Sequence, residues 1–404
     1  MKIFLRILVA AALLTAYLLL WPTRVDPVVW TPPAAPALEG QYAYNEKLKG
    51  IQRLAEGIGK GPEAVNVDAV GRVYTGYADG RVVQFSANGA SYTVWTNTGG
   101  RPLGITFGPN GGLIIADARK GLLHMGRKLK PLVTEADGVP LGFTDDADNT
   151  ILTKDIYFTD ASSKFGYGHH MDDAIEHGAH GRLLNYNVAT GQTKVLMKDL
   201  HFANGVAVAP DDSFVLVNET WEYRVLRYWL KGEKAGTWDV FIDNLPGFPD
   251  NITCNNRDRF WLALAAPRDE LLDQLAGDVF KRKLISRLPG FLQPAPKRHS
   301  FVLGLDLNGA VIANLQYAGD DAYSPITSAR EFGPWLYFGS LTEPAIGRIP
   351  LNVAIPTAPP PPAGWQTLPP SIEVRVTKSR EEEEEERREE EMEKRGIKDP
   401  DEKD

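Results

Sequence analysis

Six short runs of β-branched, aliphatic and aromatic residues recur along the middle of the chain. They are Val73–Gly76, Leu113–Asp117, Ile156–Asp160, Phe214–Val217, Phe260–Ala263 and Leu336–Ser340. Such runs are typical of β-strands. Their first residues are spaced 40, 43, 58, 46 and 76 residues apart, and a period of about 40–45 residues is typical of four-stranded propeller blades. The pattern predicts an all-β, six-bladed β-propeller; a pair of β-sandwiches is the alternative.

The propeller is predicted to occupy residues 45–352 as one domain. The 404 residues would suggest two or three domains at about 150 residues each, but the repeat fills most of the chain. The two longest spacings imply insertions, which we place at residues 169–180 and 268–297. A single cysteine excludes an intrachain disulfide framework.

The N-terminus combines two basic residues with a long apolar run. Lys2 and Arg6 precede a run that continues to Trp21, close to the ~20 residues that span a bilayer. Bulky residues end the run, with no small-residue cleavage site. We predict an uncleaved signal anchor over residues 1–22, a Pro-rich stalk over 23–44, a cytoplasmic N-terminus and an extracytoplasmic propeller. A cleaved signal and secretion is the alternative.

The C-terminal part is predicted to be a Pro-rich linker over residues 353–377 and a Glu/Arg-rich tail over 378–404. The tail holds 8 basic and 14 acidic residues and so carries most of the net charge of −8. A charge run without an apolar face is solvent-exposed, so we interpret it as a solubilising tail, with a docking segment for a basic partner as the alternative. The acidic balance argues against nucleic acid as a partner.

Oxygen-bearing side chains recur nine to eleven residues before the runs. They are Glu63, Asp145, Asn204, and the pair Asp250 and Asn251. Equivalent repeat positions are equivalent structural positions, and the innermost strand of each blade lines the central channel. Four of the six blades therefore present a carboxylate or carboxamide to one axis. Calcium takes ~6–8 such oxygen ligands, and the lack of His and Cys argues against zinc. For any one of these residues, an ordinary turn is the competing interpretation.

Several segments resemble the strictosidine synthase-like family. The most specific is Pro246-Gly247-Phe248-Pro249-Asp250-Asn251-Ile252, and Gly61-Pro62-Glu63, Arg101-Pro102-Leu103-Gly104-Ile105 and Asn204-Gly205-Val206 also match. The resemblance covers about residues 50–350. It implies a six-bladed propeller of the superfamily that includes paraoxonases, gluconolactonases and organophosphate hydrolases, most with calcium in the channel. By resemblance, Glu63, Asn204, Asp250 and Asn251 match the metal ligands.

The chain departs from the family pattern at three places. Asp145 stands where relatives have Asn, which keeps an oxygen donor and adds negative charge. Ala64 replaces the carboxylate that holds a second ion in paraoxonases, so we expect one ion. The blade-six stretch 324–328 lacks the glutamate with which strictosidine synthases catalyse their condensation, which argues against that reaction.

A channel calcium with open positions would polarise an ester or lactone oxygen and activate water. The sequence therefore predicts a membrane-anchored, calcium-dependent hydrolase of small esters or lactones (arylesterase- or lactonase-like). Asp250 is the first candidate for the general base and Asp146 the second. No Gly-x-Ser-x-Gly elbow is present. A calcium-stabilised binding or scaffold propeller is the main alternative, and a strictosidine synthase-type lyase is the third.

Three histidines are secondary candidates. His169 and His170 lie in the first insertion, where a solvated loop or a substrate-gating lid both fit. His124 follows the second run and is either a surface histidine or one near the channel.

Overall fold

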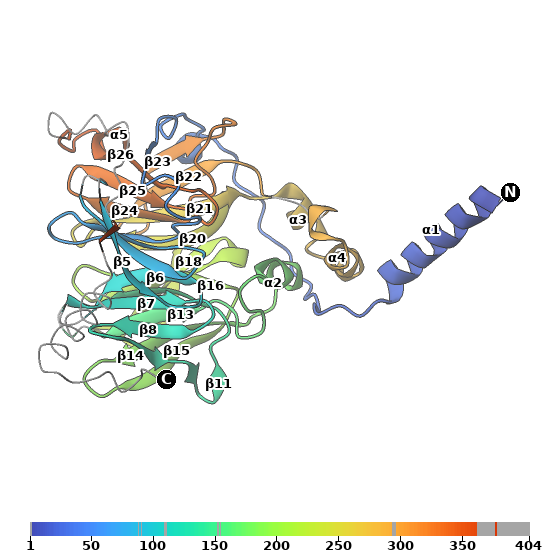
Figure 1. Ribbon diagram of the computed structural model, residues 1–404, viewed down its shortest axis with the longest axis horizontal. Coiled ribbons are helices and arrows are strands. Elements are labelled where there is room, and N and C mark those ends of the chain that lie inside the picture. The colour runs from blue at the N-terminus through green and yellow to red at the C-terminus, as the bar shows by residue number, and fades with distance from the viewer. Residues whose placement is uncertain are drawn as a thin grey trace, which may run out of the picture.

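Six antiparallel sheets stand around one axis in the computed structural model, which confirms the predicted six-bladed β-propeller (Figure 1). The structure describes residues 2–361 except 88, 90, 109–110, 152, 154 and 293–295, together with 376–377. Blade one consists of β2 (Val65–Val67), β3 (Val73–Gly76), β4 (Arg81–Phe85) and β5 (Tyr92–Asn97). Blade two consists of β6 (Pro102–Phe107), β7 (Leu113–Asp117), β8 (Gly121–Met125) and β9 (Leu129–Val133). Blade three consists of β12 (Thr144–Asn149), β13 (Ile156–Asp160), β14 (Gly181–Asn187) and β15 (Gln192–Leu200). The next two are β16 (Ala203–Val208), β17 (Phe214–Glu219), β18 (Arg224–Trp229), β19 (Trp238–Ile242); and β20 (Gly247–Cys254), β21 (Arg259–Pro267), β22 (Ser300–Asp306), β23 (Val311–Tyr317).

The sixth blade closes the ring with a strand from the other end of the domain. It consists of β24 (Ser328–Phe332), β25 (Trp335–Gly339), β26 (Ile346–Pro350) and β1 (Gln52–Leu54). β1 pairs antiparallel with β26, with Gln52 opposite Arg348. This pairing joins the first strand of the ring to the last blade, so the sheet edge that β26 would expose is covered.

Each predicted run forms the second strand of a blade: β3, β7, β13, β17, β21 and β25. These strands are almost entirely buried because both faces pack against neighbouring blades. Between blades four and five, for example, the fully buried rings of Phe260 and Phe301 pack with Phe214. The first strand of each blade contacts the first strands of its two neighbours around the axis, as a channel lined by innermost strands requires.

Short elements outside the blades complete the fold. They are the hairpin β10 (Glu135–Ala136) and β11 (Val139–Pro140), the 3-10 turns η1 (Gly40–Tyr42), η3 (Thr220–Glu222) and η4 (Gly290–Leu292), and α5 (Leu351–Ala354). The strand β27 (Val376–Thr377) pairs in parallel with β5. The predicted linker over 353–377 is described only up to residue 361 and at β27, and the predicted tail over 378–404 lies outside the described residues.

Four helices lie on one side of the propeller (Figure 1). The apolar N-terminal run forms α1 (Lys2–Leu20), which projects away from the blades. The first predicted insertion contains α2 (His170–Glu176), and the second contains α3 (Glu270–Leu275) and α4 (Val279–Ser286). Asp269 and Asp278 cap α3 and α4 by accepting from the backbone N–H three residues on. We call α2, α3 and α4 the crown.

The predicted stalk is an extended segment that packs against the crown. The backbone N–H of Val28 donates to the carbonyl of Glu176 at 2.9 Å. The indole of Trp30 stacks on the imidazole of His177, with ring centroids 3.8 Å apart and planes 7° apart. The segment that follows α1 is therefore held on the propeller.

Replacing Trp30 with alanine should loosen the stalk while leaving the propeller folded. The variant loses a stacked ring contact and the burial of its apolar surface, which together contribute about 2 kcal/mol to the free energy of detaching the stalk. The population in which the stalk is detached should therefore increase roughly 30-fold. Hydrogen exchange of the amides of residues 25–31 measures this change. Equal exchange in Trp30→Ala and the wild type would contradict the docked stalk.

Candidate metal centre

The first strands of blades two to five share one irregularity. Their pairing with the second strand shifts between Pro102 and Ile105, Thr144 and Ala147, Ala203 and Val206, and Pro249 and Ile252. Two residues lie inside each shift: Leu103-Gly104, Asp145-Asp146, Asn204-Gly205 and Asp250-Asn251. A bulge redirects the side chains of its strand, so the same redirection occurs in four blades at the repeat position identified in the sequence.

Two of these bulges require glycine because the inner strands approach closely. A Cβ on Gly104 would lie 2.4 Å from Asp146 Oδ1, and a Cβ on Gly205 would lie 2.5 Å from the Cα of Asn251. Both distances are far below van der Waals contact. The two glycines therefore allow the bulges of neighbouring blades to meet around the axis.

The first residue of each bulge lines a common cavity of about 640 Å³. Leu103, Asp145, Asn204 and Asp250 line it together with Glu63, which precedes β2 in blade one. The structure thus brings four of the five predicted metal ligands to one cavity. The fifth, Asn251, lies behind the lining and donates from Nδ2 to Glu63 Oε1 at 2.6 Å.

The carboxyl groups of this cluster resist ionisation because they are buried together. Burial raises the pKa of Glu63 to about 7, and the nearby Arg101 guanidinium opposes that rise. Burial raises the pKa of Asp145 well above its ordinary value, and the charge of Glu63 raises it further. The pKa of Asp250 rises for the same two reasons, while a hydrogen bond from Asn204 favours its charged form. Three buried carboxyl groups that repel one another ionise together at neutral pH only when a nearby cation compensates their charge.

Several oxygens of the cluster have no hydrogen-bond partner among the described residues. They are Glu63 Oε2, Asn204 Oδ1 and Asn251 Oδ1, and all three are buried. Buried polar atoms are rarely left unpaired, and such exceptions often mark an ion or water site. The donor set consists of carboxylate and amide oxygens, which are the ligands of calcium. The residues present therefore fit a calcium ion.

Asp146, the second residue of its bulge, faces away from the cavity lining. Its Oδ1 accepts from the backbone N–H of Ala147 at 2.8 Å and its Oδ2 from that of Val206 at 3.0 Å. Burial raises its pKa to about 8. The carboxyl group joins the inner strands of blades three and four, so the geometry favours Asp250 over Asp146 as a base.

The three predicted histidines occupy different environments. His170 at the start of α2 lines the cavity, and burial lowers its pKa. His169 is partly exposed; its Nδ1 is 2.9 Å from Asp172 Oδ2 and its Nε2 is 3.0 Å from Arg24 Nη1. His124 lies on β8, the third strand of its blade, beside Gly112 rather than among the residues that line the cavity. A gating role for His124 therefore has no geometric support.

A second cluster, not identified in the sequence, lies under the stalk. His177 Nε2 is 3.0 Å and His201 Nε2 is 3.8 Å from Glu222 Oε1. The two imidazoles stack with ring centroids 4.6 Å apart and planes 29° apart, and the ligand atoms of the three residues lie within 4.8 Å of one another. We interpret this cluster as the support for Trp30, which covers the other face of His177.

The second strands hold the bulges in place through acidic residues at their ends. Asp117, Asp160 and Glu219 end β7, β13 and β17. They accept from the backbone N–H of Arg101 (3.0 Å), Phe143 (2.8 Å) and His201 (2.9 Å), two or three residues before the bulges. Asp160 also binds Arg182, whose Nη2 is 2.6 Å from Oδ2. This repeated contact fixes the backbone that carries Asp145 and Asn204.

Replacing Asp160 with alanine should destabilise the protein by about 3–5 kcal/mol, because Arg182 would remain buried without its partner. Urea unfolding measures the loss. The double variant Asp160→Ala/Arg182→Met, which removes both charges, should recover part of it. A loss below about 1 kcal/mol in the single variant would contradict this role.

A different buried acid makes stability depend on pH. Asp173 of α2 accepts from Ser162 Oγ at 2.6 Å and from Trp221 Nε1 at 2.8 Å, and burial raises its pKa from 3.8 to about 6. The folded state therefore holds this proton more tightly than the unfolded chain. The stabilisation from this proton is present below pH 4 and is lost as the pH rises to about 6.

The variant Asp173→Asn should be more stable than the wild type at pH 7. Asparagine can accept from Trp221 and donate to Ser162 Oγ without charge, so the gain is up to about 3 kcal/mol. Thermal unfolding at pH 4 and pH 7 measures the difference, and the gain should shrink at pH 4. A variant that is less stable at both pH values would contradict the assignment.

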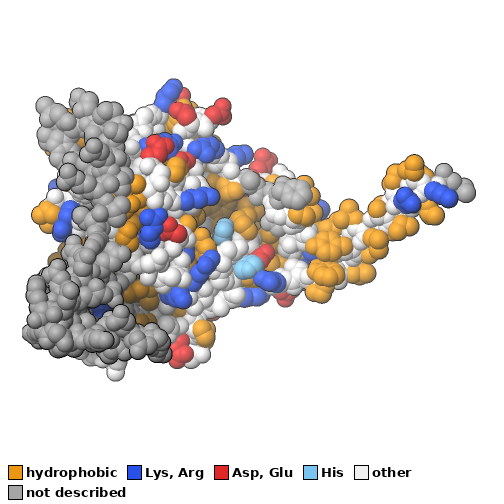
Figure 2. Space-filling view, in the orientation of Figure 1, with side chains coloured by type: hydrophobic (Ala, Val, Ile, Leu, Met, Phe, Trp, Pro, Cys, Tyr) orange, Lys and Arg blue, Asp and Glu red, His pale blue; other side chains and the backbone are white. Residues whose placement is uncertain are grey.

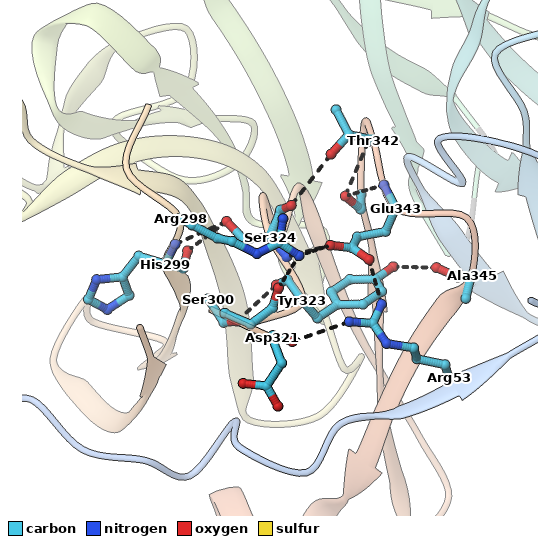
Figure 3. Close-up of polar contacts among 12 residues, drawn as sticks. Arg53, Arg298, His299, Ser300, Asp321, Tyr323, Ser324, Thr342, Glu343 and Ala345 are labelled. Carbon is cyan, nitrogen blue, oxygen red and sulfur yellow. Dashed lines mark hydrogen bonds and ion pairs between the residues drawn. The ribbon is translucent and has the colours of Figure 1, made fainter. Parts of the chain in front are cut away.

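The cavity rim in blade six is fixed by Glu343 (Figure 3). Its carboxylate pairs with Arg53 of β1, with Arg298 Nη2 at 2.7 Å, and with the backbone N–H of Ser324 at 3.2 Å. Glu343 therefore connects the closing strand to a segment that lines the cavity. It is engaged by two arginines and is not among the cavity-lining residues, so it does not replace the glutamate missing from 324–328.

The wall of the cavity is mainly apolar and aromatic. It includes Phe143, Tyr167, Met171, Phe202, Trp221, Phe248 and Leu272. These residues come from the bulge-preceding segments, the loop before α2, the crown and η3, so their convergence could not be found from the repeat alone. Phe143, Phe202 and Phe248 each stand two residues before Asp145, Asn204 and Asp250, which is the signal that would have identified them.

Comparison with known proteins identifies the family. Residues 146–233 match the family described as strictosidine synthase, and residues 40–85 match strictosidine synthase-like, N-terminal. Strictosidine synthase-like 4 of Arabidopsis thaliana is 38% identical over 340 residues, covering 81% of this chain and 88% of that protein. The chain belongs to the strictosidine synthase-like family. The adipocyte plasma membrane-associated protein of Rattus norvegicus, a similar relative, is 35% identical over 377 residues, covering 87% of this chain and 99% of that protein.

Solved structures share the fold of this strictosidine synthase-like protein. A gluconolactonase from Xanthomonas campestris has a TM-score of 0.54 at 14% identity, covering 81% of this chain and 97% of that chain. A calcium-binding protein, regucalcin, from Agrobacterium tumefaciens has a TM-score of 0.50 at 16% identity, covering 80% and 95%. At these identities the likeness shows the propeller fold alone.

Proposed function

We propose that the chain is a membrane-anchored, calcium-dependent hydrolase of esters or lactones. The observation that carries this proposal is the convergence of Glu63, Asp145, Asn204 and Asp250, with unpaired oxygens, on one apolar-walled cavity. The structural neighbours support it, since they include a gluconolactonase and a calcium-binding protein.

Calcium would be held by Glu63, Asp145, Asn204 and Asp250, with Asn251 orienting Glu63 through its 2.6 Å hydrogen bond. When bound, calcium would polarise the ester or lactone carbonyl and stabilise the negative charge that develops on its oxygen. The three carboxylates and the amide oxygen of Asn204 offer one set of hard ligands, so we propose one ion at this position.

Asp250 would serve as the base that takes a proton from the attacking water. Burial and the charge of Glu63 raise its pKa above that of an exposed aspartate, which favours its acceptance of a proton from water. The hydrogen bond from Asn204 orients the carboxylate. Phe202 and Phe248 line the cavity beside it and would exclude bulk water, which strengthens electrostatic interactions within the site.

The N-terminal helix α1 would anchor the protein in a membrane. It is 19 residues long, apolar and unburied, and Figure 2 shows hydrophobic side chains along its length and basic residues near its N-terminus. With Lys2 and Arg6 on the cytoplasmic side, the propeller would lie on the extracytoplasmic side. N-terminal sequencing of the mature protein distinguishes this anchor from a cleaved signal.

The proposed activity is tested on the purified full-length protein in detergent. Arylesters and lactones should be hydrolysed in calcium and not after chelation. No activity on a broad panel, together with calcium-dependent stabilisation, would favour a binding or scaffold propeller instead. Condensation of an amine with an aldehyde would favour the lyase alternative, which the missing blade-six carboxylate argues against.

A further inference from the structure

The C-terminal end of α1 is bonded to the crown. Arg287, which follows α4, donates from Nε to the carbonyl of Trp21 at 2.6 Å and from Nη1 to that of Leu18 at 3.1 Å. In return, the Tyr17 hydroxyl donates to the carbonyl of Arg287 at 3.1 Å. The last carbonyls of a helix have no partners within it, so Arg287 fills the position of a C-terminal cap for α1.

The next residues of the chain bridge α4 and α2. Asp26 Oδ1 lies 2.9 Å from Lys283 Nζ, and the backbone N–H of Asp26 donates to Glu176 Oε2 at 2.7 Å. Arg282 is buried and donates to the carbonyls of Val28 and Ile175, both at 2.7 Å. No free linker separates α1 from the crown, so the position of α1 in a bilayer determines the position of the crown.

The length of α1 places the crown at the membrane surface. Nineteen residues span about 28 Å, which matches a hydrocarbon core of about 30 Å. Trp21 therefore lies at the boundary, where tryptophan is enriched. The polar interface beyond it is about 5–7 Å deep, and Arg287, directly after α4, is hydrogen-bonded to this end of α1.

The crown presents large apolar side chains on its outer surface. Phe280 of α4 is 60% exposed and Leu271 of α3 is 47% exposed. In the turn η4, which follows α4 in the chain, Leu292 is 57% exposed. Lys281 and Lys283 follow Phe280 in the sequence of α4. Apolar side chains beside lysines are typical of helices that lie in a membrane interface.

The same crown forms part of the cavity wall. His170 and Met171 of α2 and Leu272 of α3 line the cavity. Leu272 and the exposed Leu271 are adjacent residues of one short helix. The rim of the cavity and part of the apolar surface of the crown are therefore formed by the same short helix, α3.

We propose that the crown is immersed in the extracytoplasmic membrane interface and that the cavity receives lipophilic, uncharged esters or lactones from the bilayer. This inference rests on the proposed membrane-anchored hydrolase and names its substrate class. The aromatic wall accommodates an apolar acyl or aryl group, and the oxygen cluster beyond it would take the carbonyl. A substrate that partitions into the bilayer is concentrated where the cavity opens.

The depth of the crown is tested with spin labels on the full-length protein in phosphatidylcholine vesicles. Cysteines replace Leu13, Leu271, Phe280 or Val70, one at a time; the native Cys254 is buried and burial raises the pKa of its thiol to about 12, so it stays unlabelled. Val70 is the matched control: it is 71% exposed in the turn that follows β2, which begins at the cavity end of the channel.

The measured quantity is the frequency with which each spin label collides with dissolved oxygen, which is concentrated in the bilayer. We expect a high collision frequency at Leu13, intermediate frequencies at Leu271 and Phe280, and the frequency of an aqueous site at Val70. Aqueous values at Leu271 and Phe280 with Leu13 inserted would overturn the inference and leave the anchor intact. Aqueous values at Leu13 as well would overturn the anchor and the inference together.

The substrate class is tested by comparing a long-chain lactone with a short, water-soluble arylester in the same vesicles. The variant Phe280→Glu should lower the rate on the long-chain lactone at least 10-fold and leave the rate on the arylester unchanged; Val70→Glu should change neither. Equal rates of the wild type and Phe280→Glu on the long-chain lactone would overturn delivery from the bilayer. Absence of hydrolysis of both substrates would count against the proposed function, while the label depths would still decide the placement.

Discussion

Replacing Asp250 with alanine should lower kcat/KM for an arylester by about a thousandfold or more. The substitution removes the general base, and a general base alone raises the rate of such a reaction by about 10²–10⁴-fold. It also removes a carboxylate from the proposed calcium cluster. Initial rates with phenyl acetate at fixed free calcium measure the loss. The variant also relieves repulsion with Glu63, so its fold should persist and the loss should be one of function.

Asp250→Asn separates the two roles of this residue. Asparagine retains an oxygen ligand and can still accept from Asn204, but it takes no proton at neutral pH. Calcium should therefore still stabilise this variant while hydrolysis is lost. Asp306→Asn, at the end of β22 where the carboxylate accepts from the backbone N–H groups of Asn308 and Ala310, is the control for an aspartate away from the cavity. Wild-type rates in Asp250→Asn would refute the role of Asp250 as base.

Removing calcium should lower the melting temperature by roughly 10 °C. An ion present at a thousandfold excess over its dissociation constant stabilises the folded state by about 4 kcal/mol, which corresponds to a shift of this size for a large domain. The physical source is the group of three carboxyl groups, Glu63, Asp145 and Asp250, which burial and mutual repulsion destabilise when no cation is bound. Differential scanning calorimetry with calcium and with EGTA measures the shift.

Glu63→Gln is the informative variant for this effect. Glutamine can still accept from Asn251 Nδ2, but it removes one of the three repelling charges. Its calcium-free form should melt higher than the calcium-free wild type, and its calcium-dependent shift should fall by more than half. An unchanged shift in Glu63→Gln would show that calcium stabilises the protein from another site.

The repeat predicted the fold and the positions of the oxygen cluster because both follow from one periodicity. A blade buries its second strand on both faces, which leaves an apolar run that is easy to recognise. The bulge begins ten or eleven residues before that run, so Asp145, Asn204 and Asp250 could be aligned without coordinates. The sequence did not show which residue of the Asp145-Asp146 pair faces the cavity, because that depends on the register shift between Thr144 and Ala147.

The crown and its connections could not be predicted from the sequence. The contacts of Trp30 with His177 and of Arg287 with Trp21 join segments separated by more than 140 residues, and no periodicity relates them. The position of His124 relative to the channel could not be predicted from the sequence either. Its place after a predicted strand was compatible with the channel, but β8 is the third strand of its blade and lies away from the axis.

The central claim is that an ion held by Glu63, Asp145, Asn204 and Asp250 drives ester or lactone hydrolysis. The most direct test is the initial rate of the full-length protein across a series of buffered free-calcium concentrations, with bound calcium measured in the same samples. The account predicts that the rate rises from background and saturates as one equivalent binds. A rate that is the same in EGTA and in saturating calcium would contradict it.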